Sequence, residues 1–563
     1  MEEKLSGRSV DAAAPSFADA LSFIDGAPDI SPTRRRDLAS GLRRVAKAIG
    51  CEPSEIPADP AWLRPRIARV APAAVGLTSK SWSNTVSDAK AALAAFGVIE
   101  GKQPKPTPLS ASWEPLWRLV LASKDPSLSP ALGRFVRFLS RLGVEPEEVA
   151  DAHADAYERA LALNEIRRSP DEPRRAAVYG WNLAVRRLPD WPRRTLSVAS
   201  RSRTYALALE DFPPSFAADL DRCLEGMSAP DPFDPEARAR PLRPATVRHR
   251  RDTLRRAASA LVLAGEPIET ITDLGVLADP AQVRRLLGWM LERNGGATSP
   301  GIAETAITLT LVARHHLRAS EDQLAALKRL ETRLAPRRSP GLTPKNRERL
   351  RPLGDATTLR KLLDLPRVLA AKARTNPKPY FAALDMEMAV AIAILLVVPI
   401  RRKNLAEIQL ERNLVRMRDG RAFLVFDAAE VKNRRPLEFE LRPEVVELID
   451  LYLREYRPRL APAGTRFLFA RRADGGPCEK SALSRRVSAV IRRETGLAFN
   501  LHLFRHLAAM IWLDANPGSY EPLRRLLGHA QLSAVLDAYV GFEAGVTTRL
   551  FSELVETLRG VRR

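Results

Sequence analysis

Apolar residues recur at spacings of three and four along nearly the whole chain, and runs that alternate apolar with polar residues are rare. This spacing is typical of amphipathic α-helices, so it predicts a mainly α fold. At roughly 150 residues per domain, a chain of 563 residues is expected to form three or four domains. The Pro-rich stretches 102–110 and 229–241 are the expected linkers.

Three segments share one local pattern, in which a basic amphipathic helix ends at a small or Gly residue and Glu-Pro follows. The three sequences are AKAIGCEPSEI, FLSRLGVEPEEV and LVLAGEPIETI. In the first, Ser31 is the expected N-cap and Gly50 the expected end of the helix. The pattern indicates a degenerate repeat of a helical module of about 80 to 100 residues, although helix–Gly–Pro–helix is also a common corner. The expected domains are 1–105, 111–230, 240–338 and 345–563.

Composition excludes several classes of protein. The longest apolar run, Met388 to Ile400, has 13 residues, short of the roughly 20 that a spanning helix needs. The three cysteines are far apart, which argues against a disulfide framework or a cysteine-based zinc site and favours a reducing compartment. With 89 Lys and Arg against 67 Asp and Glu, the net charge is +22. A soluble, cytoplasmic protein with a polyanionic partner is expected.

One region departs from the helical pattern. RAFLVFDA is a short apolar run, and PLEFELRP alternates Leu437, Phe439 and Leu441 with two glutamates. Both predict strands, and the polar EVKNRR between them suits a hairpin. The fold class is therefore mainly α with a small antiparallel sheet.

The residues best suited to chemistry lie in and after this region. They are two arginines, a lysine, two histidines and a tyrosine, in the sequences VVPIRRKNL, EVKNRR, LHLFRH, LLGH and DAY: Arg401, Lys432, His502, Arg505, His529 and Tyr539. Such a set suits the transfer of a phosphodiester to a tyrosine. Guanidinium groups match the charge that gathers on the phosphate oxygens. A phenol, which titrates near pH 10, needs fixed cations and an imidazole to react as phenolate.

The order Arg, Lys, H-x-x-R, L-G-H, Tyr resembles the tyrosine recombinase (phage integrase) superfamily over residues 345–563. Residues 240–335 also resemble its helical core-binding domain, which clamps DNA. The resemblance implies the following roles: Tyr539 as the nucleophile that forms a 3′-phosphotyrosyl bond, Arg401 and Arg505 as the phosphate clamp, Lys432 as general acid, His502 as an aid to proton transfer and His529 as a donor to the phosphate.

The resemblance further implies a site-specific recombinase or integrase, expected to belong to a bacterial mobile element and to act in the nucleoid. Four protomers would join two DNA duplexes, with partner recombinases possible and with no metal or cofactor. The modules at 1–105 and 111–230 would bind DNA or serve oligomerisation. A type IB topoisomerase uses nearly the same residues, and a non-catalytic DNA-binding protein is the other alternative.

The sequence departs from the usual family pattern at three places. Asn404 stands at the position after the first arginine where the family often has an acidic residue. Phe504 replaces the usual Leu of H-x-L-R, and Tyr539 lies ten residues after His529 rather than nine. One extra residue rotates a helical side chain by about 100°, unless the turn before the helix absorbs it.

Several nearby residues are rivals for these roles. Arg402 competes with Arg401, Arg434 and Arg435 with Lys432, and Tyr520 with Tyr539. His506 lies four residues after His502, a spacing that also suits two metal ligands, but a packing role or a role supporting the site residues is favoured.

The tail helix carries Leu550, Phe551, Leu554 and Leu558 on one face. It is expected to pack on its own domain or to dock into a neighbouring subunit.

Overall fold

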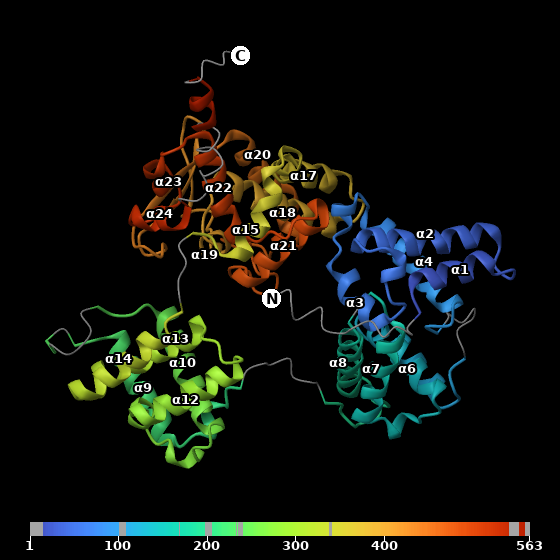
Figure 1. Ribbon diagram of the computed structural model, residues 1–563, viewed down its shortest axis with the longest axis horizontal. Helices are drawn as coiled ribbons and strands as arrows, with labels where there is room; N and C mark the ends of the chain where they lie inside the picture. Colours follow the sequence, from blue (N-terminus) through green and yellow to red (C-terminus); the bar gives the residue numbers. More distant parts are fainter. Residues whose placement is uncertain are drawn as a thin grey trace. The chain divides into compact units, whose positions relative to one another are not determined.

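The computed structural model describes residues 15–100, 108–167, 169–197, 205–231, 233–234, 240–336, 341–539 and 551–557. These residues are mainly helical and include one three-stranded antiparallel sheet, as the sequence predicts (Figure 1). The chain divides into two compact units, Met1–Val198 with Pro340–Arg563, and Ala199–Ser339. Of the two expected linkers, residues 102–107, 232 and 235–239 lie outside the described residues.

The first unit begins with a helical module that we call module 1 (residues 15–100). It contains α1 (Phe17–Gly26), α2 (Pro32–Ile49), α3 (Pro60–Arg69) and α4 (Ser79–Ala95), with the 3₁₀ turns η1 (Pro53–Glu55) and η2 (Pro72–Val75). The Ser31 hydroxyl accepts from the backbone N–H of Arg34 and caps α2, while Gly50 ends this helix in the left-handed conformation. Both predicted boundaries of this helix are confirmed.

Module 2 (residues 108–197) is built from α5 (Trp113–Ala122), α6 (Leu128–Arg141), η3 (Pro146–Glu148), α7 (Asp151–Asn164) and α8 (Asp171–Arg187). Its core holds three mutually packed, fully buried indoles, Trp113, Trp181 and Trp191. Arg64 of module 1 donates to the carbonyls of Ala162 and Glu165 at 2.5 and 2.8 Å, so the two modules are joined.

The second unit, module 3 (residues 205–336), contains η4 (Leu209–Asp211), α9 (Pro214–Ser228), α10 (Pro244–Leu263), η5 (Ile268–Thr270), α11 (Leu274–Ala278), α12 (Pro280–Arg293), α13 (Pro300–His315) and α14 (Glu321–Leu334). Helix α9 falls within 111–230 of the sequence-based division, yet it packs in this core through Phe216, Leu220 and Leu224. The backbone N–H of Leu242 also bonds Met227 O at 2.8 Å. The apolar face of α9 therefore outweighs the Pro-rich connector that follows it.

The C-terminal region (residues 341–539) completes the first unit. Its helices are α15 (Pro344–Leu350), η6 (Arg351–Gly354), α16 (Ala356–Leu363), α17 (Leu365–Thr375), α18 (Pro379–Val397), α19 (Arg402–Ala406), α20 (Pro443–Leu451), the π turn η7 (Tyr452–Tyr456), η8 (Arg457–Arg459), α21 (Lys480–Thr495), α22 (Leu501–Ala515), α23 (Tyr520–Leu526) and α24 (Ser533–Tyr539). A single large core joins most of them around α18.

Helix α18 is long and apolar enough to cross a membrane by length and composition alone, but 72% of its apolar stretch is buried inside this region. Its Glu387 carboxylate is 1% exposed and accepts two bonds from Arg486, at 2.6 and 3.0 Å. A helix that buries a paired carboxylate among other helices is the core helix that the sequence predicts.

The sheet has the strand order β1 (Leu414–Arg416), β2 (Ala422–Phe426) and β3 (Leu437–Leu441), and both pairs are antiparallel. The register pairs Leu424 with Leu414 on one side and with Phe439 on the other. The predicted hairpin is confirmed as β2 and β3. Strand β1 was not predicted, because three residues show no alternation.

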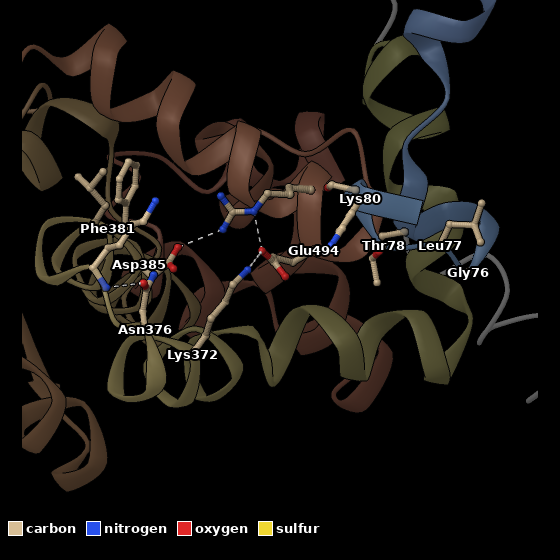
Figure 2. A pocket seen from close by; sticks show the side chains of 14 residues that line it. Gly76, Leu77, Thr78, Lys80, Lys372, Asn376, Phe381, Asp385 and Glu494 are labelled. Atoms are coloured by element: carbon tan, nitrogen blue, oxygen red, sulfur yellow. Dashed lines mark hydrogen bonds and ion pairs between the residues drawn. The ribbon is translucent and has the colours of Figure 1, made fainter. Parts of the chain in front are cut away.

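Module 1 meets the C-terminal region at the end of α21. The Arg492 guanidinium donates to the carbonyl of Arg69 at 2.7 Å. A pocket of about 860 Å³ lies beside this contact, and Figure 2 shows Lys372 and Glu494 among the residues that line it. Lys372 forms an ion pair with Glu494 at 2.9 Å, so these two side chains neutralise each other in the wall of the pocket. None of the pocket's lining residues is a candidate catalytic residue.

Candidate active site

The first arginine follows the buried helix. Helix α18 ends at Val397, and Arg401 then has extended backbone angles as the N-cap of α19. The buried helix therefore fixes where Arg401 leaves the core. Arg402 is the first residue of α19 and is exposed, whereas Arg401 is half-buried. This difference in burial favours Arg401 over Arg402 as the candidate catalytic arginine.

Lys432 lies in the connection between β2 and β3. Its side chain is exposed, and it has no hydrogen-bond or ion-pair partner among the described residues. Two of the contacts that hold this connection come from residues near the other candidate residues. Asn404 donates to the Glu430 carbonyl at 3.4 Å, and Asn433 donates to the Gly528 carbonyl at 2.6 Å. Because Asn433 follows Lys432 and Gly528 precedes His529, the lysine lies beside the L-G-H segment.

Helix α22 carries the H-x-x-R sequence. The Asn500 side chain caps it by accepting from the backbone N–H groups of His502 and Leu503. Arg505 and His506, one turn along, are 5% and 7% exposed, whereas His502 is exposed at the start of the helix. The spacing thus directs one histidine toward solvent and an arginine into the interior.

The Arg505 guanidinium ties two distant segments together. One Nη donates to the Pro399 carbonyl at 2.8 Å and the other to the Leu527 carbonyl at 2.6 Å. Pro399 lies two residues before Arg401, and Leu527 lies two residues before His529. The planar guanidinium presents its donors in a fixed fork, so it holds the two carbonyls at a defined separation and direction.

The glycine of L-G-H is required by its surroundings. Gly528 has a φ of 58°, and a Cβ there would lie 2.7 Å from Leu437 Cδ2. The backbone N–H of His529 then bonds the Arg524 carbonyl at 2.9 Å. The turn after α23 therefore fixes the direction of His529.

Tyr539 is the last residue of α24 and is 3% exposed. Its ring centroid lies 5.5 Å from that of His506 and 6.5 Å from that of His529. Helix α24 begins only at Ser533, so the non-helical turn 529–532 absorbs the extra residue between His529 and Tyr539. The longer gap does not turn the phenol away from the histidines.

The site is rich in cations and poor in anions. Among the described residues, neither Arg401 nor Arg505 is paired with a carboxylate. Removing a cation from water without a partner costs several kcal/mol. The arrangement is therefore suited to an anionic group supplied from outside, such as a phosphate.

The pKa values follow from this crowding. Burial, reinforced by Arg401, lowers the pKa of Arg505 to about 10. Burial and the neighbouring arginines lower the pKa of His529 to about 4. The ring of His502 is exposed but packs against His506, and this partial burial, with Arg505 and Arg401 nearby, lowers its pKa below the ordinary value. Burial raises the pKa of Tyr539, although Arg505 and Arg401 oppose the rise. At neutral pH the histidines are neutral and the phenol keeps its proton.

His506, for which the sequence favoured a packing role or a role supporting the site residues, lies in the site. Its ring lies 4.6 Å from that of His502 by centroids and 5.5 Å from that of Tyr539. Burial, with His502 and Arg505 nearby, lowers its pKa to about 3, and its buried Nδ1 has no hydrogen-bond partner among the described residues. The H-x-x-R-H spacing places it on the buried face one turn after His502.

Five of the six predicted residues thus come together, and Lys432 lies at the edge through its neighbour Asn433. Tyr520 begins α23 and is partly buried against the cluster that contains Tyr539.

In the tail, residues 551–557 are helical, with Phe551 and Leu554 exposed. Leu550 and Leu558 lie outside the described residues, so the docking of this tail stays a prediction.

No protein-family model and no curated protein matches the chain. Several solved structures do. The XerH site-specific recombinase in a post-cleavage complex with palindromic difH substrate is 14% identical, with 59% of this chain and 94% of that chain covered and a TM-score of 0.35. XerA recombinase is 14% identical, with 62% and 99% covered and a TM-score of 0.25. A lambda integrase dimer bound to a COC′ core site is 16% identical, with 66% and 89% covered and a TM-score of 0.35.

At such identities and TM-scores, the activity of this chain has to follow from its own site.

Proposed function

We propose that the protein is a tyrosine recombinase that cleaves and rejoins DNA through a 3′-phosphotyrosyl intermediate. One observation carries the proposal: a buried tyrosine lies beside three neutral histidines and two arginines that pair with no carboxylate among the described residues. A phosphodiester would supply the missing negative charge. It would also lie where the phenol oxygen could attack phosphorus.

Each residue has a role that its position supports. Arg401 and Arg505 bind the nonbridging oxygens and stabilise the charge that develops on them. His502 and His529 are neutral, so they can donate or accept at the phosphate, and His502 is open to solvent for proton exchange. Tyr539 Oη attacks phosphorus and passes its proton to the neutral imidazole of His502, which releases it to solvent, while the bond to the 5′ oxygen breaks.

Lys432 is the proposed donor of a proton to the leaving 5′ oxygen. It is exposed and pairs with none of the residues that the structure describes, so a DNA strand can reach it without breaking an ion pair to them. The reverse reaction uses the energy kept in the phosphotyrosine, so a 5′ hydroxyl from a second duplex can rejoin the strand without ATP.

The charge distribution supports a nucleic acid substrate. Residues 341–563 contain 39 Lys and Arg against 25 Asp and Glu, so they hold +14 of the total +22. Each phosphate that a cation neutralises releases a counterion and favours binding. We also propose that the protein acts as an assembly of several protomers on DNA and that it serves a mobile element.

The test is covalent capture. Full-length protein is incubated with sheared genomic DNA carrying random nicks, so that a cleaved strand end can diffuse away before it is rejoined. Adducts that survive SDS are collected and their DNA is sequenced. We expect wild-type protein to yield adducts at a defined sequence and Tyr539→Phe to yield none.

Tyr520→Phe is the matched control, because it removes a phenol oxygen from the neighbouring helix and should leave adduct formation unchanged. Adducts lost in Tyr520→Phe but kept in Tyr539→Phe would reverse the assignment. Relaxation of supercoiled DNA of any sequence would instead favour a topoisomerase. Tight binding without any adduct would leave only a binding protein.

A further inference from the structure

The three helical modules repeat one local structure in detail. One helix in each module is followed by a glycine with positive φ: Gly50 at 81° after α2, Gly143 at 70° after α6 and Gly265 at 94° after α10. We call α2, α6 and α10 the long helices, although α8 in module 2 is longer than α6. The next residue donates its backbone N–H to the carbonyl five residues before it, in Cys51 to Ala46, Val144 to Leu139 and Glu266 to Leu261, at 3.3, 3.1 and 3.2 Å. A 3₁₀ turn follows each time.

Burial keeps the same register. Counted back from each glycine, the residues at four, five, eight and eleven positions are buried and apolar in all three long helices. Six positions after each glycine, Ile56, Val149 and Ile271 are all fully buried. A common corner would not fix the core positions on both sides of the turn, so the three modules are copies of one architecture.

Charge is segregated in the same way. Helices α2, α6 and α10 together contain 14 Lys and Arg but only 2 Asp and Glu. The rest of residues 15–100, 108–197 and 205–336 contains 28 Lys and Arg and 37 Asp and Glu. The modules as a whole are therefore nearly neutral, but α2, α6 and α10 each carry a net positive charge that the rest of the modules balances.

On α2, the positive charge forms a row on the exposed side. Arg36, Arg44 and Lys47 are exposed and have no acidic partner among the described residues. Arg43 completes the row and comes only within 3.9 Å of Asp25, a contact between two exposed side chains that contributes little. From the first to the last of these residues the row runs about 16 Å along the helix axis.

Helix α6 carries a shorter row of the same kind. Arg134, Arg137 and Arg141 are exposed at spacings of three and four, and the helix contains no acidic residue. Arg141 approaches Glu100 at 3.7 Å, again between exposed side chains. Such rows face water at a cost in mutual repulsion and are suited to a partner with regularly spaced negative charges.

We infer that modules 1 and 2 are two further copies of module 3 and that each binds duplex DNA along the basic row of its long helix. This inference rests on the proposed function only for the identity of the polyanion. The DNA backbone carries one charge per roughly 1.7 Å of duplex, so each row can span several phosphates without reading bases. The enzyme would then hold DNA well beyond the site of cleavage.

The test uses full-length protein carrying Tyr539→Phe, so that covalent attachment cannot contribute to binding. The module 1 variant is Arg36→Gln, Arg44→Gln and Lys47→Gln, and the module 2 variant is Arg134→Gln, Arg137→Gln and Arg141→Gln. The control changes three exposed arginines outside the long helices, Arg118→Gln, Arg159→Gln and Arg186→Gln. Affinity for a long duplex is measured by fluorescence anisotropy over a range of salt concentrations.

We expect each row variant to bind more weakly, with the slope of log K against log salt reduced by up to about 2.7, or about 0.9 per lost phosphate contact. The control should keep the wild-type slope, and melting curves should show all three variants folded. Row variants with the wild-type slope would overturn the inference. A lower sedimentation mass with unchanged DNA binding would also overturn it and assign the rows to a protein interface.

Failure of this inference is distinct from failure of the proposed function. If the Tyr539-dependent adduct forms but the row variants bind normally, only the inference fails. If no adduct forms while the row variants still lose their salt dependence, the inference stands and the proposed chemistry falls.

Discussion

The imidazole of His506 packs against the phenol of Tyr539, with ring centroids 5.5 Å apart. Because the pKa of His506 is lowered to about 3, the ring is neutral near pH 7 and brings no charge to this contact. It is thus a positioning residue for the proposed nucleophile, and the buried, unpartnered Nδ1 contributes no hydrogen bond to folding.

His506→Phe keeps the ring and removes the unsatisfied nitrogen, so we expect stability equal to or above wild type. His506→Ala leaves a cavity and should lower the free energy of unfolding by about 2–4 kcal/mol. Urea unfolding and the rate of adduct formation measure both effects. If Phe proves as inactive as Ala, the nitrogen itself takes part in the reaction.

Arg401 and its neighbour Arg402 offer a second comparison. Arg401→Gln should slow adduct formation by about 10²- to 10³-fold, the usual effect of losing one donor to a developing oxyanion. Arg402→Gln should change the rate only a few-fold, since its side chain is exposed on α19. Single-turnover cleavage with saturating DNA separates this effect from weaker binding. Equal losses in both variants would mean that either arginine can serve.

The histidines predict a dependence of stability on pH. The pKa values of His529 and His506 are lowered from 6.5 to about 4 and about 3. Below pH 6.5 the unfolded chain therefore binds more protons than the folded one, and stability falls as pH drops toward 4. Each histidine contributes a slope of up to about 1.4 kcal/mol per pH unit. Urea unfolding across this window should show a shallower slope in His506→Phe, and an unchanged slope would contradict the assignment.

The sequence predicts this molecule best where local chemistry decides the structure. Ser31 and Gly50 bound α2 because a capping hydroxyl and a left-handed glycine act within one turn. The alternation around Phe439 gives β3 for the same reason. The grouping of the candidate residues could also be expected, because their order along the chain carries the family resemblance.

What could not be predicted depends on contacts between distant segments. The bond from Asn433 to the Gly528 carbonyl joins residues 95 apart, and no periodicity indicates it. The same holds for the assignment of α9 to module 3, where an apolar helix face selects its core across a Pro-rich connector. The ring contact between His506 and Tyr539 likewise requires the fold, since either residue alone suits ordinary packing.

The role of Lys432 can be separated from simple charge. Lys432→Met should slow cleavage of an ordinary phosphodiester, because the 5′ oxygen then leaves without a proton. A substrate with sulfur in place of the bridging 5′ oxygen should restore the rate, since a thiolate is a far better leaving group. Arg435→Met, in the same connection, is the control and should cleave both substrates at the wild-type rate. A defect in Lys432→Met that persists with the sulfur substrate would assign the lysine to binding.

Gly528 and Leu437 provide the last test, of how the L-G-H turn is held. Gly528→Ala places a Cβ 2.7 Å from Leu437 Cδ2 at a φ of 58°, so either the Leu437 side chain or the turn must shift, and a shift of the turn would carry His529 with it. We expect a loss of about 1–3 kcal/mol in unfolding free energy and slower cleavage. Leu437→Ala in the same chain removes the clash but not the strain of a positive φ, so the double variant should recover part of the cleavage rate. A double variant whose losses simply add would show that Leu437 does not set the position of His529.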